Sequence, residues 1–71
     1  MIIYTDHAEQ RMAKRFIKRR WVEEAIRNPT RLIPARYGKM QAIKEVNGEE
    51  ISVIFARERD DHIVITVFWG R

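Results

Sequence analysis

Two side chains near the N-terminus, His7 and Arg11, are of types that can perform acid–base chemistry on a phosphodiester. A neutral imidazole takes a proton from an attacking hydroxyl, and an imidazolium returns one to a leaving group, both near neutral pH. With RNA the 2′-hydroxyl of the substrate is the nucleophile, so neither a metal ion nor a protein nucleophile is needed. Residues four apart share a helical face, which Arg15 extends, and arginines there would stabilise charge growing on phosphate oxygens.

The same three residues have a simpler interpretation, which the sequence leaves open. His7 can be a helix-end residue that bonds the backbone, with Arg11 and Arg15 on an ordinary solvated face. An isolated His-x-x-x-Arg pattern is more often of this kind.

A second group of candidates lies at Arg36–Lys39, ahead of a predicted strand. Its Gly38 suits a bend that would present Arg36 and Lys39 to phosphate and leave Tyr37 free to stack on a base. An ordinary loop that enters a hairpin also explains these residues, and such loops are the more common case.

Two strand residues complete the candidates. Arg57 is expected near Gly38 in the hairpin register derived below, so it can join the Arg36–Lys39 end. Thr66 is the one hydroxyl in an apolar strand. It could hydrogen-bond a substrate or His7, although threonine is also simply favoured in strands.

The charge is concentrated in the N-terminal half. Fourteen Lys and Arg against ten Asp and Glu give a net charge of +4. Basic character suggests an anionic partner, most often nucleic acid, although a basic surface can also lack one. Between positions 11 and 20 there is no acid and there are six cations: Arg11, Lys14, Arg15, Lys18, Arg19 and Arg20.

Length and composition exclude several classes of protein. Seventy-one residues form a single domain, here residues 1–71, with a thin core. Without cysteine there is no disulfide or thiolate metal site, and the two histidines match no zinc pattern, so we expect no metal and no cofactor. No apolar run approaches the roughly 18 residues of a membrane span, and the N-terminus lacks the features of a signal peptide. We therefore expect a cytoplasmic protein without membrane contact.

Two amphipathic helices are expected in the first half. Asp6 is a good N-cap with Glu9 three residues on, and apolar residues recur every four positions in a helix of about ten residues. A second helix follows and ends at Asn28–Pro29, because a residue before proline resists helical geometry. Lys18 cannot cap its start. The apolar positions are Ala8, Met12 and Phe16 in the first helix, and Val22, Ala25 and Ile26 in the second.

Strands are expected in the second half. Asn47–Gly48 between runs 39–46 and 49–58 is a strong hairpin signal. Ile63–Trp69 is apolar on both sides, which is typical of a central strand, and Thr30–Pro34 suits a short edge strand. A two-residue turn would place Val46 opposite Glu49, Lys44 opposite Ile51, Ala42 opposite Val53 and Met40 opposite Phe55.

The predicted fold class is therefore α+β. Two N-terminal helices pack on one face of a three- to four-stranded antiparallel sheet, in the order α-α-β-β-β.

The chain carries four short motifs, which are His7-x-x-x-Arg11-Met12-x-x-Arg15-x-Ile17, Val22-x-x-Ala25-Ile26-x-Asn28-Pro29, Arg36-Tyr37-Gly38 and Thr66-Val67-x-Trp69. Together, these motifs resemble a widespread prokaryotic family labelled only as a domain of unknown function. That family is similar to RelE-type and BrnT-type toxins of toxin–antitoxin systems. The likeness runs from His7 to Trp69.

The resemblance implies the barnase–EndoU–colicin–RelE fold class of metal-independent ribonucleases. By position it implies that His7, Arg11 and Arg15 are the polar residues of the first helix, that Arg57 is a phosphate-binding base and that Thr66 is the strand threonine. RNA, including ribosome-associated mRNA, and an antitoxin protein are the implied partners.

Two functions remain open at this stage. One is a small endoribonuclease with His7 as acid–base and with Arg11, Arg15 and Arg57 on the phosphate. The other is a catalytically inactive basic module that binds RNA or a protein. Phe68 stands where the family often has tyrosine, so a hydroxyl that could donate a proton is missing there.

Overall fold

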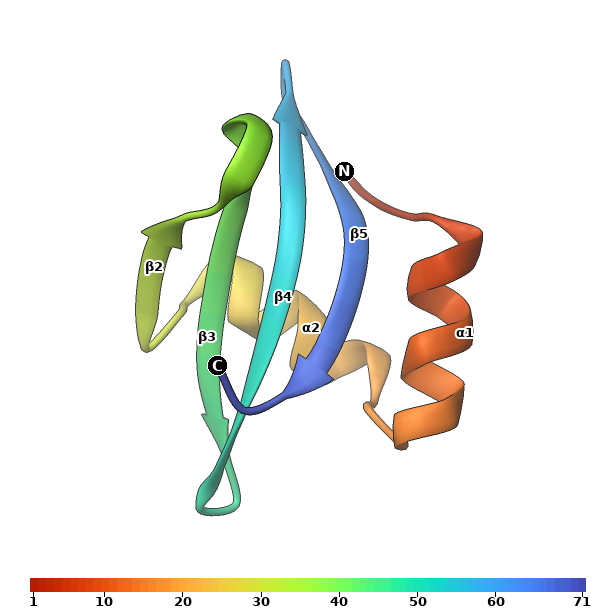
Figure 1. Ribbon diagram of the computed structural model, residues 1–71, viewed down its shortest axis with the longest axis vertical. Helices are drawn as coiled ribbons and strands as arrows, with labels where there is room; N and C mark the ends of the chain where they lie inside the picture. The colour runs from red at the N-terminus through yellow and green to blue at the C-terminus, as the bar shows by residue number, and fades with distance from the viewer.

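The computed structural model describes residues 1–71 as two helices packed on one face of a five-stranded sheet (Figure 1). The strand order in the sheet is β1-β5-β4-β3-β2. Neither helix is long and apolar enough to cross a membrane. Along the chain the elements are β1 (Ile2–Tyr4), α1 (Asp6–Arg15), α2 (Arg19–Arg27), β2 (Arg31–Pro34), the 3₁₀ turn η1 (Arg36–Gly38), β3 (Met40–Val46), β4 (Glu49–Glu58) and β5 (Asp61–Trp69).

The α+β class and the hairpin register are confirmed. Asn47 and Gly48 have φ angles of 52° and 84°, as a two-residue primed turn requires. The short edge strand is present as β2, antiparallel to β3. All four predicted β3–β4 pairs occur: Val46 with Glu49, Lys44 with Ile51, Ala42 with Val53 and Met40 with Phe55.

The sheet has one strand that the sequence analysis did not anticipate. β1 pairs in parallel with His62–Val64 of β5, so the sheet is mixed and not purely antiparallel. Three residues are too few to display the alternation that reveals a strand. Because β1 is short, it covers only the beginning of the β5 edge.

Both ends of α1 differ from expectation. Thr5, not Asp6, is the N-cap, and its Oγ1 accepts a hydrogen bond from the Ala8 N–H at 3.1 Å. Asp6 is instead the first helical residue. At the other end Phe16 adopts a left-handed φ of 56° and is 84% exposed, so its predicted place in the core is wrong.

The way α1 ends explains why Phe16 is outside. The Ile17 N–H donates to the Met12 carbonyl at 2.9 Å, across the left-handed residue between them. This is the Schellman pattern, in which the residue after the left-handed one contacts the last turn of the helix. Ile17 therefore enters the core beside Met12, and Phe16 turns to solvent.

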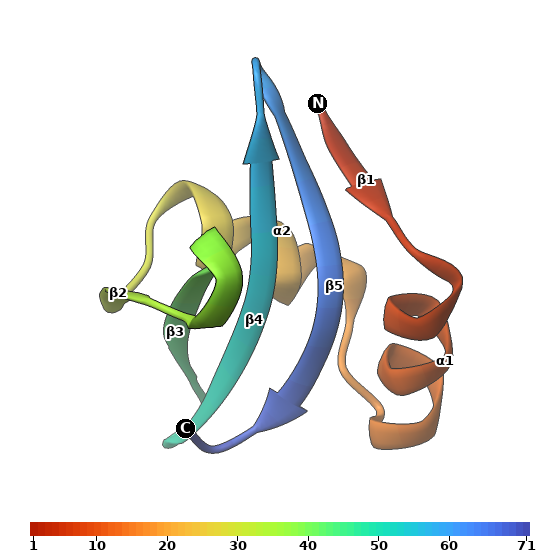
Figure 2. The ribbon, with the colours of Figure 1, turned by 45° about the horizontal axis from the view of Figure 1, so that its top comes forward.

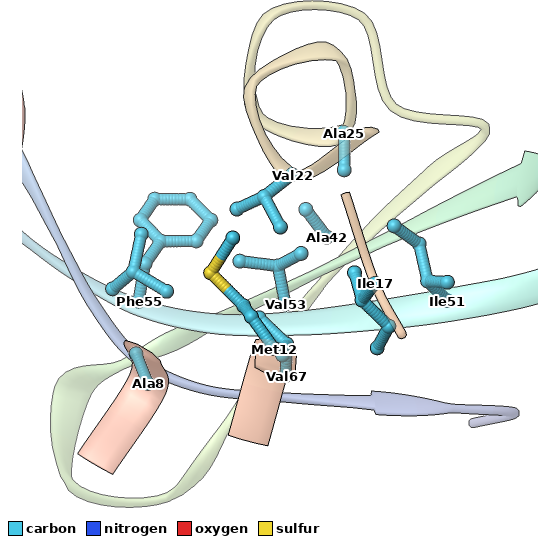
Figure 3. Close-up of a cluster of buried hydrophobic side chains, with 11 residues drawn as sticks. Ala8, Met12, Ile17, Val22, Ala25, Ala42, Ile51, Val53, Phe55 and Val67 are labelled. Atoms are coloured by element: carbon cyan, nitrogen blue, oxygen red, sulfur yellow. The ribbon is translucent and has the colours of Figure 1, made fainter. Parts of the chain in front are cut away.

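The core lies between the helices and one face of the sheet (Figure 3). α1 packs mainly on β5, and α2 packs on β3 and β4. No side chain caps the start of α2, as expected because the N-cap position is occupied by Lys18. Arg19 connects α2 with α1 and β1, because it pairs with Glu9 of α1 and its guanidinium lies 4.1 Å from the ring centre of Tyr4 in β1. The buried cluster consists of Ala8, Met12, Ile17, Val22, Ala25, Ala42, Ile51, Val53, Phe55, Val64 and Val67.

Candidate functional site

The edge of β5 positions the N-terminal candidates. Beyond the short β1, α1 runs beside β5 (Figure 2). The Thr5 hydroxyl lies 2.9 Å from the Val64 carbonyl, and the Arg15 Nη1 donates to the Val67 carbonyl at 2.7 Å. The Trp69 indole N–H donates in turn to the Arg15 carbonyl at 2.8 Å. The Thr5 and Arg15 side chains thus donate hydrogen bonds to β5 carbonyls that would otherwise bond to a neighbouring strand.

A β-bulge interrupts β5 beside the start of α1. Val64 faces Phe55 and Thr66 faces Ile54, so Ile65 is an extra residue without a partner on β4. Bulges re-aim the side chains around them. Thr66 consequently shares the sheet face of Ile54, which is the face opposite the helices, while Val64 and Val67 both enter the core.

His7 and Arg11 lie together on the exposed side of α1. The Arg11 Nε–H donates to His7 Nε2 at 3.4 Å, so Nε2 is the acceptor in this contact. The i, i+4 spacing predicts this proximity. An imidazole nitrogen that accepts beside a guanidinium places a possible proton acceptor next to an anion-binding group, which is the pairing that phosphodiester chemistry needs.

Arg15 and Lys14 have different surroundings. Arg15 is half-buried, and one of its nitrogens is occupied by the Val67 carbonyl, so it holds α1 against β5. Lys14 is exposed and lines a shallow surface depression together with Gln10, Arg11 and Ala13. The cations free to meet a ligand on α1 are therefore Arg11 and Lys14.

The four candidate catalytic residues do not form one pocket. Arg57 pairs with His62 close to the turn between β4 and β5. It lies on the same sheet face as Phe55, which is the face that the helices cover. Thr66 is on the opposite face, and the only side-chain partner of His7 is Arg11. The structure thus brings His7 and Arg11 together and keeps Arg57 and Thr66 apart from them and from each other.

The Arg36–Lys39 group lies at the opposite edge of the sheet from α1. It forms η1 and the residue after it, between the outer strand β2 and its neighbour β3. Arg57 is two residues beyond the Met40–Phe55 pair, so it lies at this end of the hairpin, as the register predicts. Tyr37 is 90% exposed with a φ of 58°, and its stacking on a base stays a prediction.

His62 has a chemical environment that the sequence did not reveal. It lies within β5, and its ring centre is 5.4 Å from that of Phe55. Burial lowers the pKa of His62, the Arg57 cation lowers it further, and the Asp61 carboxylate partly opposes both. The packed ring makes His62 a structural residue that prefers to be neutral.

This pKa shift predicts a pH-dependent stability. Below the ordinary histidine pKa of about 6.5 the unfolded chain binds a proton more readily than the folded one. The free energy of unfolding should therefore be at its full value above that pH and fall as the pH drops through the window below it. Urea unfolding across pH 7 to 5 should show a shallower decline for His62→Phe than for the wild type. If stability declined equally in the wild type and in His62→Phe, or if the control His7→Gln removed the decline, His62 would not be its cause.

Comparison with known proteins places the whole of this arrangement within one family. The sequence model of a family described as Domain of unknown function (DUF4258) matches residues 4–69, which include every candidate residue placed above. The chain belongs to this family. The resemblance to an uncharacterised family is thereby confirmed, and the DUF4258 match begins in β1 and ends at the last residue of β5. Neither a curated protein nor a solved structure matches the chain.

Proposed function

We propose that this DUF4258 protein binds RNA through the lysines and arginines of α1 and of the turn that follows it. One observation supports this most strongly. Of the fourteen lysines and arginines, only Arg19 and Arg71 lie within salt-bridge distance of a carboxylate. The other twelve have no carboxylate partner, and phosphate groups on a polymer can neutralise several cations at once.

The N-terminal cations form the densest part of this surface. Within positions 11–20 the structure pairs Arg19 with Glu9, places Arg15 on a carbonyl and sets the Lys18 ammonium 5.3 Å from the ring centre of Trp21. Arg11, Lys14 and Arg20 have no carboxylate partner. Arg11 and Lys14 line one surface depression, so a phosphate group there would meet both cations.

Salt dependence of binding tests the proposal. An unstructured single-stranded RNA whose binding neutralises about four phosphates should show a log–log slope of affinity against salt near −3. Fluorescence anisotropy between 50 and 200 mM salt would measure it. Arg11→Glu combined with Lys14→Glu should weaken binding and flatten the slope, with Arg57→Glu combined with Arg59→Glu as the matched control. Absence of binding at low salt, or equal effects of both pairs, would refute the proposal.

Cleavage of the bound RNA is a second candidate function, favoured by the 3.4 Å contact between Arg11 and His7. A phosphate that draws Arg11 toward itself would free His7 Nε2. The imidazole could then take the proton of a 2′-hydroxyl as that oxygen attacks phosphorus. The bond to the 5′-oxygen breaks, and the imidazolium returns the proton to that oxygen, leaving a 2′,3′-cyclic phosphate. The proton balance closes on His7 alone.

The same proposal includes a role as the toxin of a toxin–antitoxin system. The resemblance to RelE-type and BrnT-type toxins supports a cytoplasmic role against RNA, free or on ribosomes, with an antitoxin protein as the natural opposing partner. A protein of that kind would need the basic surface described above whether or not it cleaves its target.

A further inference from the structure

Phe16 is the most conspicuous side chain that neither the core nor the proposed chemistry uses. It is 84% exposed although it is a large aromatic residue, and its φ of 56° lies where non-glycine residues are strained. A glycine or asparagine is the usual residue at this position of a helix end. Exposure and strain both oppose stability, and an outlier of this kind motivates a functional hypothesis.

The surroundings of Phe16 combine rigid support with positive charge. The residue before it, Arg15, is held at both ends, because its side chain bonds β5 and its carbonyl accepts the Trp69 indole N–H at 2.8 Å. Trp69 packs edge-on against Trp21, with ring centres 5.9 Å apart. Lys14 and Lys18 flank Phe16 two residues away on each side, and both are exposed.

We propose that Phe16 is a stacking platform for an unpaired base, and that it selects single-stranded RNA over duplex RNA. This rests on the proposed RNA-binding function. Lysines alone attract any polyanion, because they respond to charge. An exposed aromatic ring among them adds affinity only for a polyanion whose flat bases are accessible, and stacking accepts any base because each has a π-face.

The opposite edge of the sheet repeats this combination. Tyr37 is 90% exposed, has a φ of 58° and lies between Arg36 and Lys39. The two most exposed aromatic residues of the chain are thus both held in left-handed backbone beside lysine or arginine.

The experiment compares one unstructured RNA strand, its duplex with the complement, and the same strand carrying abasic nucleotides. Phe16→Ala should weaken binding of the intact single strand by roughly 5- to 100-fold, the loss expected for one stacked base. Its salt slope and its affinity for the duplex and for the abasic strand should stay unchanged. Phe16→Trp should retain the single-strand affinity. Circular dichroism should show that Phe16→Ala is folded, since the ring makes no core contact.

Three results would overturn the inference. Unchanged single-strand affinity in Phe16→Ala, together with weakening by Arg11→Glu and Lys14→Glu, would remove the stacking role and leave RNA binding standing. No RNA binding by the wild type would remove both. Binding of polyglutamate that competes with RNA and also depends on Phe16 would show that the ring recognises an acidic protein.

Discussion

Phe55→Ala should lower the free energy of unfolding by roughly 3–5 kcal/mol, the usual cost of emptying a fully buried phenylalanine site. The ring is 1% exposed, pairs across the hairpin with Met40 and faces the helices from the centre of the sheet. A domain of this size is stabilised by only about 5–15 kcal/mol in total, so the variant should unfold at a much lower urea concentration or be partly unfolded in buffer.

The chain contains a matched control for this prediction. Phe16→Ala removes the same side chain from a position that is 84% exposed, so its unfolding midpoint should equal or exceed that of the wild type. Phe16→Gly should be more stable by about 1 kcal/mol, because glycine adopts positive φ without strain. Urea titrations that show Phe55→Ala unshifted would mean that the other face of the sheet packs against the helices.

If the protein cleaves RNA, His7→Ala should reduce the rate by about 10²–10⁴-fold, the usual contribution of one acid–base group. The fold and the RNA affinity should be kept, since the His7 side chain is exposed and its one hydrogen bond is to Arg11. Wild-type products should end in 2′,3′-cyclic phosphate, form in the presence of EDTA, and fail to appear when the cleavage site carries 2′-deoxyribose. Denaturing gels and mass spectrometry of the products would show this.

Two further variants locate the reacting site. His62→Phe replaces the other histidine and should retain cleavage, because His62 packs on Phe55 at the far end of the β4–β5 hairpin. Arg57→Ala distinguishes two possible phosphate sites. The variant should lower turnover only if the phosphate binds at Arg57, as the toxin resemblance implies. Turnover should be unchanged if the phosphate binds at Arg11. Cleavage that persists in His7→Ala, or that requires added magnesium, would rule out the mechanism.

Local chemistry explains which parts of the fold could be predicted. Asn47–Gly48 determined the β3–β4 register because its turn type admits one pairing, and Asn28–Pro29 marked the end of α2. β1 was not predicted because three residues are too few to show the alternation of apolar and polar residues that indicates a strand. Phe16 was misplaced because the spacing from Met12 continues the apolar stripe, whereas the helix ends one residue earlier in a left-handed turn.

The candidate site was predictable only where it is local. The His7–Arg11 contact follows from helical spacing alone. The bond between Arg15 and the Val67 carbonyl joins residues 52 positions apart, so no local pattern reports it. Thr66 faces away from the helices because Ile65 is inserted as a bulge, and a strand that is apolar on both sides gives no sign of such an insertion.

The most direct test of the central claim, that RNA lies on the lysine and arginine side chains of α1, is an amide NMR titration of the folded protein with an unstructured single-stranded RNA. The largest chemical-shift changes should map to residues 10–20, with smaller changes at residues 36–39 if η1 forms a second contact. The indole N–H of Trp69 should also respond, because it is bonded to the end of α1. Shifts confined to other parts of the sheet, or none at an excess of RNA over protein in low salt, would contradict the claim.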